Sequence, residues 1–82
     1  MSAIDDLADQ LARDALDAAA RLGDDRLIDD ISKAIGASSP ISQEAFVSAV
    51  RIRQALARGR AVMDSRLTQA ASQKAGPEKS GS

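Results

Sequence analysis

Alanine supplies nearly half of the apolar residues in this chain, and this limits the core that the chain can build. Among 82 residues there are 17 Ala, against six Ile, seven Leu, three Val, two Met and a single Phe. A domain of this length buries only about 60% of its unfolded surface even when it is well packed. With alanine as the main apolar residue, we expect one domain at most, with a thin core.

The composition lacks the cross-links that stabilise many small domains. There is no Cys for a disulfide bond, and without Cys or His there is no cluster that could ligate zinc. A partner subunit is the remaining way to cover apolar surface, although some small bundles do stand alone. We therefore predict no metal site and no cofactor, and we favour a protein that binds another polypeptide.

Charge is divided unevenly along the chain, although the net charge is only −1. Residues 1–39 carry nine Asp against three Arg and one Lys, whereas residues 40–82 carry five Arg and two Lys against two Glu and one Asp. We interpret this chiefly as two halves whose opposite charges steer their own pairing. The alternative is that the basic half meets an acidic partner or nucleic acid.

Catalysis and nucleic-acid binding both lack the residues that they need. There is no His as a general base, no Cys nucleophile and no Tyr or Trp. The Asp residues are spread around polar faces and do not form an acid/base pair or a calcium loop. The arginines of residues 51–66 do not share one helix face, and no aromatic residue is available to stack on bases. We predict neither an enzyme nor a nucleic-acid-binding protein.

The sequence shows no pattern that would direct it into or across a membrane. The N-terminus has no basic segment followed by an apolar one, so we expect no signal peptide. No apolar run approaches 18 residues, so we expect no transmembrane helix. The expected location is the cytoplasm.

Residues 3–22 are predicted to form an amphipathic helix. Apolar residues recur with the i, i+3, i+4, i+7 spacing that places them on one face, and Asp and Arg residues fill the other. Ser2 is a candidate N-cap, with Asp5 and Asp6 in the first turn, where the helix dipole favours negative charge. We expect a neighbouring helix of the same chain to cover this stripe.

Gly23 is predicted to end the first helix. The next apolar stripe consists of Leu27, Ile28, Ile31 and Ile35. It lies about half a turn out of phase with the first, so a continuous helix would carry apolar residues on opposite faces. A break at Gly23, with Asp24 or Asp25 as the next cap, removes the conflict and places a second helix over about 25–35.

A longer third helix is predicted over about 40–72. Ser39 is a candidate cap, with Pro40 at the first helical position, where a missing N–H costs nothing. Only Gly59 interrupts the helix, at about 1 kcal/mol relative to Ala, which indicates that another backbone comes close there. Residues 73–82 are predicted to be a disordered tail. The fold class is therefore all-α: one domain over 1–72, a small helical hairpin or three-helix arrangement with a long C-terminal helix.

The third helix has more apolar surface than one neighbour can cover. One stripe holds Phe46, Val50, Ala57 and Ala61, and a second holds Ala49, Ile52, Leu56, Met63, Leu67 and Ala70. Arg53 and Arg60 lie between them, where their stems can cover apolar surface while their charged ends reach a carboxylate. We expect one stripe to pack on the first two helices and the other to bind a partner, and the pattern leaves open which. The candidate partner-binding residues are Phe46, Ala49, Val50, Ile52, Arg53, Leu56, Arg60, Met63 and Leu67.

Residues 40–67 resemble a known family of small helical chaperones. After Pro40 the pattern runs through Phe46, Ala55-Leu56, Gly59 and Val62-Met63. It is similar to the second hairpin helix of the YscE-type E component, the needle co-chaperone of type III secretion systems. The resemblance implies a cytoplasmic, virulence-associated hairpin that, with a partner chaperone resembling a tetratricopeptide repeat, keeps a needle subunit soluble and monomeric. It also implies that Phe46, Leu56, Val62 and Met63 lie in the hairpin core or at the co-chaperone interface.

Two hypotheses of function follow. The first is a helical protein-binding module, acting as a co-chaperone in a hetero-complex with a secretion subunit. The second is a homo-oligomeric helical protein, such as a dimeric bundle or coiled coil with an antitoxin-like or other regulatory role. A third hypothesis is that the chain is itself a polymerising, needle-like subunit. The lack of aromatic residues near the C-terminus disfavours it.

Overall fold

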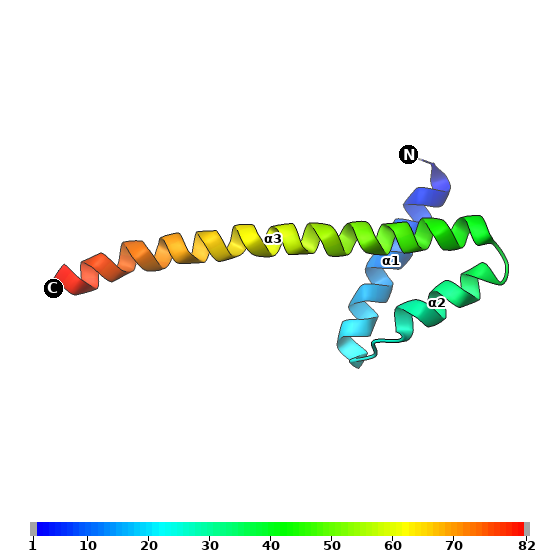
Figure 1. Cartoon of the computed structure of the whole chain (residues 1–82), viewed down its shortest axis with the longest axis horizontal. Helices are drawn as coiled ribbons and strands as arrows, with labels where there is room; N and C mark the ends of the chain where they lie inside the picture. Colours follow the sequence, from blue (N-terminus) through cyan, green and yellow to red (C-terminus); the bar gives the residue numbers. More distant parts are fainter. Residues whose placement is uncertain (1, 82) are drawn as a thin grey trace.

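The computed structural model describes the backbone of residues 2–81 and the side chains of residues 2–73. Three helices make up this part of the chain: α1 (Ala3–Leu22), α2 (Leu27–Gly36) and α3 (Pro40–Gly81). Figure 1 shows α1 crossing α3 at a steep angle, α2 returning to the start of α3, and α3 continuing far beyond both. The predicted all-α fold with three helices and a long C-terminal helix is confirmed.

The capping signals predicted for α1 are present. The Ser2 hydroxyl accepts a hydrogen bond from the backbone N–H of Asp5 at 3.2 Å, and both Asp5 and Asp6 lie in the first turn. At the other end Gly23 adopts a left-handed conformation, with φ of 63°, and its N–H donates to the carbonyl of Ala19. This geometry ends α1 where the sequence pattern predicted a break.

Replacing Gly23 with alanine is expected to destabilise the protein by about 1–2 kcal/mol, because a Cβ is unfavourable in the left-handed conformation. The space around Gly23 is open, so the penalty arises from the backbone and not from a clash. Thermal unfolding followed by circular dichroism measures the loss. Gly23→Asn is the matched control, since Asn tolerates this conformation better; equal losses in both variants would contradict the backbone explanation.

The start of α2 differs from the prediction by two residues. The carboxylate of Asp24 accepts a hydrogen bond from the N–H of Arg26 at 3.0 Å, which holds residues 24–26 in a turn. The helix therefore begins at Leu27, and its N-cap residue, Arg26, makes no side-chain capping bond. Neither Asp24 nor Asp25 is the N-cap, so that expectation was wrong, although Asp24 does hold the entry to the helix.

The turn into α3 uses the predicted cap. The hydroxyl of Ser39 accepts a hydrogen bond from the N–H of Ser42 at 3.1 Å, and Pro40 occupies the first helical position. The side chain of Gln43 reaches back to α2 and donates to the carbonyl of Ser32 at 3.0 Å. It lies over Gly36, where an added Cβ would come within 2.5 Å of the Gln43 amide carbon. Gly36 thus permits α2 and α3 to pack closely.

The far end of α3 extends beyond the predicted boundary at residue 72, since the helix continues to Gly81. Over residues 73–81 the backbone is helical where a disordered tail, 73–82, was predicted, and Ser82 lies outside the described residues.

The core lies where α1 crosses α3. Its buried residues are Ala12, Ala15, Phe46, Ala49 and Val50, and Leu16, Ile28, Ile31, Ile35 and Val47 pack against them while partly buried. Phe46 is only 1% exposed and is the only large side chain among the described residues that is fully buried. Because two of the five buried residues belong to α1 and both are alanines, α1 and α3 can approach closely around one aromatic ring.

The molecule is elongated for its size. Its radius of gyration is 18.9 Å, whereas a compact domain of this length has about 12 Å. Its accessible surface is 6395 Å², whereas a compact monomer of this mass exposes about 4700 Å². The excess arises because most of α3 projects past α1 and α2 with no neighbour (Figure 1). The fold therefore leaves α3 as an arm with unpacked sides.

Candidate protein-interaction surface

An apolar stripe runs along α3 on a side that neither α1 nor α2 covers. We call it the α3 stripe, and it consists of Ile41, Ala45, Ile52, Leu56, Met63 and Leu67. At 100° per residue these six residues fall within an arc of about 80°. The four large apolar side chains of this row beyond the crossing are 58%, 68%, 48% and 63% exposed, in the order Ile52, Leu56, Met63 and Leu67. A row of large apolar side chains exposed to water is a candidate interaction surface.

The N-terminal part of α1 forms a wall beside the α3 stripe. Ile4, Asp5 and Asp9 of α1 and Ile41, Ala45 and Ile52 of α3 line a shallow groove of about 740 Å³, together with Ser2, Glu44, Ser48 and Ala49. The floor of this groove is apolar, and Asp5, Asp9 and Glu44 give it acidic edges. The α3 stripe thus begins inside an acidic corner and continues along the free arm.

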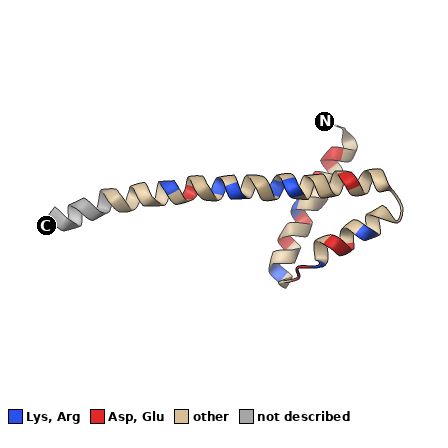
Figure 2. Cartoon of the chain, viewed as in Figure 1, with Lys and Arg blue, Asp and Glu red and all other residues tan. Residues whose placement is uncertain are grey.

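The arm itself is basic. Figure 2 shows Lys and Arg residues along the ribbon of α3, whereas most Asp and Glu residues of the described chain lie on α1 and α2. Residues 54–73 contain Arg58, Arg60 and Arg66 against Asp64 alone. The charge asymmetry seen in the sequence is therefore a separation in space, with an acidic body and a basic arm.

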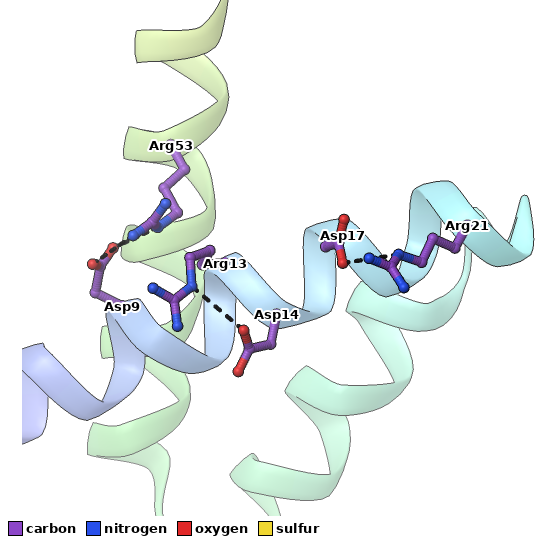
Figure 3. A network of polar contacts seen from close by, with 6 residues as sticks. All are labelled: Asp9, Arg13, Asp14, Asp17, Arg21 and Arg53. Atoms are coloured by element: carbon purple, nitrogen blue, oxygen red, sulfur yellow. Dashed lines mark hydrogen bonds and ion pairs between the residues drawn. The ribbon is translucent and has the colours of Figure 1, made fainter.

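Arg53 joins the arm to the body through a two-pronged ion pair. Its Nε and Nη2 atoms each donate to a carboxylate oxygen of Asp9 at 2.7 Å, as Figure 3 shows. Both side chains are partly exposed. These hydrogen bonds lower the pKa of Asp9 and raise the pKa of Arg53. The Arg13–Asp14 and Asp17–Arg21 pairs in the same view are more exposed and contribute little.

Asp9→Asn is expected to lower the unfolding temperature at neutral pH, because it removes this charged pair. Since the folded-state pKa of Asp9 lies below its ordinary value of 3.8, the pair stabilises the fold fully above that pH. The stabilisation is lost as the pH falls from 3.8 through the lower folded-state pKa. The difference between the two proteins should therefore shrink in that window, as measured by thermal melts.

Asp17→Asn is the matched control for this pH series, because Asp17 pairs with the well-exposed Arg21 at 3.1 Å. It should leave the unfolding temperature nearly unchanged. A loss of stability in Asp9→Asn that persists unchanged below the window would show that the carboxylate charge is not responsible.

Three of the nine predicted partner-binding residues belong to the core of the chain itself. Phe46, Ala49 and Val50 are buried against α1, so they are corrected from partner contacts to core residues. They lie on the side of α3 that faces α1, which α1 fills with its two small alanines. The structure thereby decides which stripe of α3 faces inward near the crossing: the one that contains Phe46 and Val50.

The other six predicted residues have three different outcomes. Ile52, Leu56, Met63 and Leu67 are exposed on the α3 stripe. Arg53 is engaged with Asp9 of the same chain, so the carboxylate that it reaches is internal. Arg60 is exposed on the arm and lines a shallow depression together with Leu56, Gly59 and Met63. Only the exposed residues remain available to another chain.

Sequence reasoning missed part of this surface. Leu7 and Leu11 of α1 are exposed, although their stripe was expected to be covered within the chain. They border a small apolar groove of about 240 Å³ with Ile4, Ile35 and Phe46. The steep crossing explains the difference, because α3 covers only the middle of α1. The helical period identified the apolar stripe of α1, but it did not indicate how much of that stripe α3 covers.

Comparison with known proteins adds no relative: no family model, curated protein or solved structure matches this chain. Within the described residues, no helix is long and apolar enough to cross a membrane.

Proposed function

We propose that the protein is a helical protein-binding module that packs the α3 stripe against an apolar helix face of another polypeptide. The observation that supports this proposal most directly is the exposure of Ile52, Leu56, Met63 and Leu67 in one row. Packing the apolar face of one amphipathic helix against an apolar surface of a partner is a common mode of protein recognition. The contacting side chains then recur every three to four residues.

The shape of the chain also supports a binding role. A helix held only by its own hydrogen bonds is marginal in water, because most helical stability in proteins comes from packing of an apolar face. The side chains of residues 54–73 of α3 are all exposed, whereas the first turns of the helix are anchored by Phe46 and Val50. The arm is therefore anchored to the core at one end, and a partner that covers its exposed apolar face would stabilise the helix.

Photo-crosslinking in cells that produce the protein tests this proposal. Benzoylphenylalanine placed at Leu56 should give covalent adducts with a polypeptide, including a copy of the chain itself. Ala61 is the matched control site, since it is equally part of the exposed arm but lies about 140° around the helix. Adducts at residue 56 and not at residue 61 are expected; no adduct at 56, or equal yields at both, would refute a role for the stripe.

The resemblance of residues 40–67 to needle co-chaperones supplies a specific candidate partner. On that hypothesis, co-expression with a needle subunit of a type III secretion system yields a stable hetero-complex in gel filtration. Leu56→Asp and Met63→Asp should abolish the complex, whereas a chain truncated after Ser72 should still form it. Separate elution of the two proteins would reject the co-chaperone identity while leaving the binding role of the stripe open to other partners.

A further inference from the structure

We infer that the occupant of the α3 stripe is a second copy of this chain, packed antiparallel with the two arms meeting near Gly59. This inference rests on the proposed function, since it names the partner of the same surface. In a two-fold symmetric dimer the same patch is used by both chains, so the patch must be complementary to itself.

The spacing of the stripe meets this requirement. Ile52 and Leu67 lie at equal distances along the chain from the point between Gly59 and Arg60, and so do Leu56 and Met63. An antiparallel pair of α3 helices centred there would place Ile52 against the partner's Leu67 and Leu56 against the partner's Met63. Every large residue of the arm's stripe therefore meets another large apolar residue over about 22 Å of helix.

Gly59 lies at the centre of this arrangement. Glycine in a helix interior costs about 1 kcal/mol relative to alanine, so its presence there needs a reason. Among the described residues nothing supplies one, because an added Cβ at Gly59 would meet no atom within 4 Å. In the antiparallel pair the two helices are closest beside Gly59, where the missing side chain permits close approach of the backbones.

Charge favours the same orientation. The antiparallel register lays residues 67–70 of one arm over residues 49–52 of the other chain, beside the groove edged by Asp5, Asp9 and Glu44. At that level Arg66 lies across from the other chain's Arg53, which Asp9 already pairs, so the acidic groups left for Arg66 at the groove edge are Asp5 and Glu44, and the symmetry repeats the contact on the other side. The acidic body and the basic arm of two chains therefore meet twice, which steers association and fixes orientation.

The surface available is large enough for a stable dimer. The chain exposes 6395 Å², about 1700 Å² more than a compact monomer of its mass. A typical stable interface buries about 800 Å² on each partner. The excess that each chain exposes is therefore about twice the area that one partner buries in such an interface.

Light scattering on the purified chain tests the dimer. The measured mass should be twice the chain mass of 8.5 kDa. Leu56→Asp should reduce it to the monomer mass, because each dimer then carries two carboxylates in its apolar centre. Ala61→Asp places the same charge on the opposite face of the arm and should leave the dimer intact. A monomeric wild-type chain, or equal loss in both variants, would overturn the inference.

Cysteine crosslinking tests the register, and the native chain has no cysteine to interfere. A chain with Leu56→Cys and Met63→Cys should form a covalent dimer on oxidation, because residue 56 of each copy faces residue 63 of the other. The two sites are about 10 Å apart within one helix, too far for an internal bond. Either single variant should remain mostly uncrosslinked. Efficient crosslinking of Leu56→Cys to itself would instead indicate a parallel pair and reject the antiparallel register.

The two sets of experiments separate the inference from the proposed function. If the purified chain is monomeric while benzoylphenylalanine at residue 56 captures a different polypeptide, the second copy is rejected and the binding stripe stands. If the purified chain is monomeric and residue 56 captures no polypeptide, both the dimer and the proposed binding function are rejected. Adducts at residue 56 whose mass is that of two chains, together with a dimer in solution, support both.

Discussion

Replacing Phe46 with alanine is expected to destabilise the protein by about 3–5 kcal/mol, which is the usual cost of removing a buried aromatic side chain. A domain of this length has about 4–12 kcal/mol of total stability. The unfolding temperature should therefore fall by about 15–30 °C, and part of the population should be unfolded at room temperature. Circular dichroism melts and chemical denaturation measure both quantities.

The reason for so large an effect is that one ring carries most of the core. The other buried residues are three alanines and a valine, which cannot fill the space that the ring leaves. The half-buried Ile28, Ile31 and Ile35 of α2 also pack against this cluster, so its loss should loosen α2 as well.

Leu22→Ala is the matched control for the loss of Phe46, because it also removes a large apolar side chain but from an exposed position at the end of α1. It should cost less than about 0.5 kcal/mol. A similar loss in Leu22→Ala and Phe46→Ala would mean that the crossing of α1 and α3 is not the core of the protein.

Replacing Ala12 with leucine is expected to destabilise the protein by about 1–3 kcal/mol, although leucine is the more hydrophobic residue. Ala12 is completely buried at the crossing, where its small size lets α1 lie close to α3. Three added carbon atoms have no space there and must push the two helices apart. Separation of the helices would also weaken the 2.7 Å contacts between Asp9 and Arg53.

Ala20→Leu makes the same substitution at an exposed position of α1 and should change the stability by no more than about 0.5 kcal/mol. Thermal melts of the two variants measure the difference. An increase in stability for Ala12→Leu would show that the crossing contains unfilled space and that the small residue at this position is not required.

Local signals in the sequence located the helices well. Ser2, Gly23, Ser39 and Pro40 act through their own backbone conformation and nearest neighbours, so their roles follow from the sequence pattern. The start of α2 was misplaced because the hydrogen bond from Arg26 to Asp24 competes with capping, and a pattern of residue types does not distinguish the two.

The candidate site was only half determined by the sequence. The helical period correctly grouped Ile52, Leu56, Met63 and Leu67 on one face of a long helix. The period also grouped Ala49 with them, although Ala49 is buried at the crossing. Phe46 and Val50 were predicted to be partner contacts, and they too are buried in the core. Periodicity assigns residues to faces of one helix, whereas contact with a second helix depends on where the two axes cross.

The alanine-rich composition fixed the elements that this chain can form: helices, a thin core, and apolar surface in excess of what that core can cover. The angle and position of the crossing were decided only in three dimensions, because they depend on one aromatic ring fitting against two alanines of α1. That packing buries the first turns of α3 and leaves the rest as a free arm. The tertiary structure thereby decided which apolar residues stabilise the fold and which remain exposed.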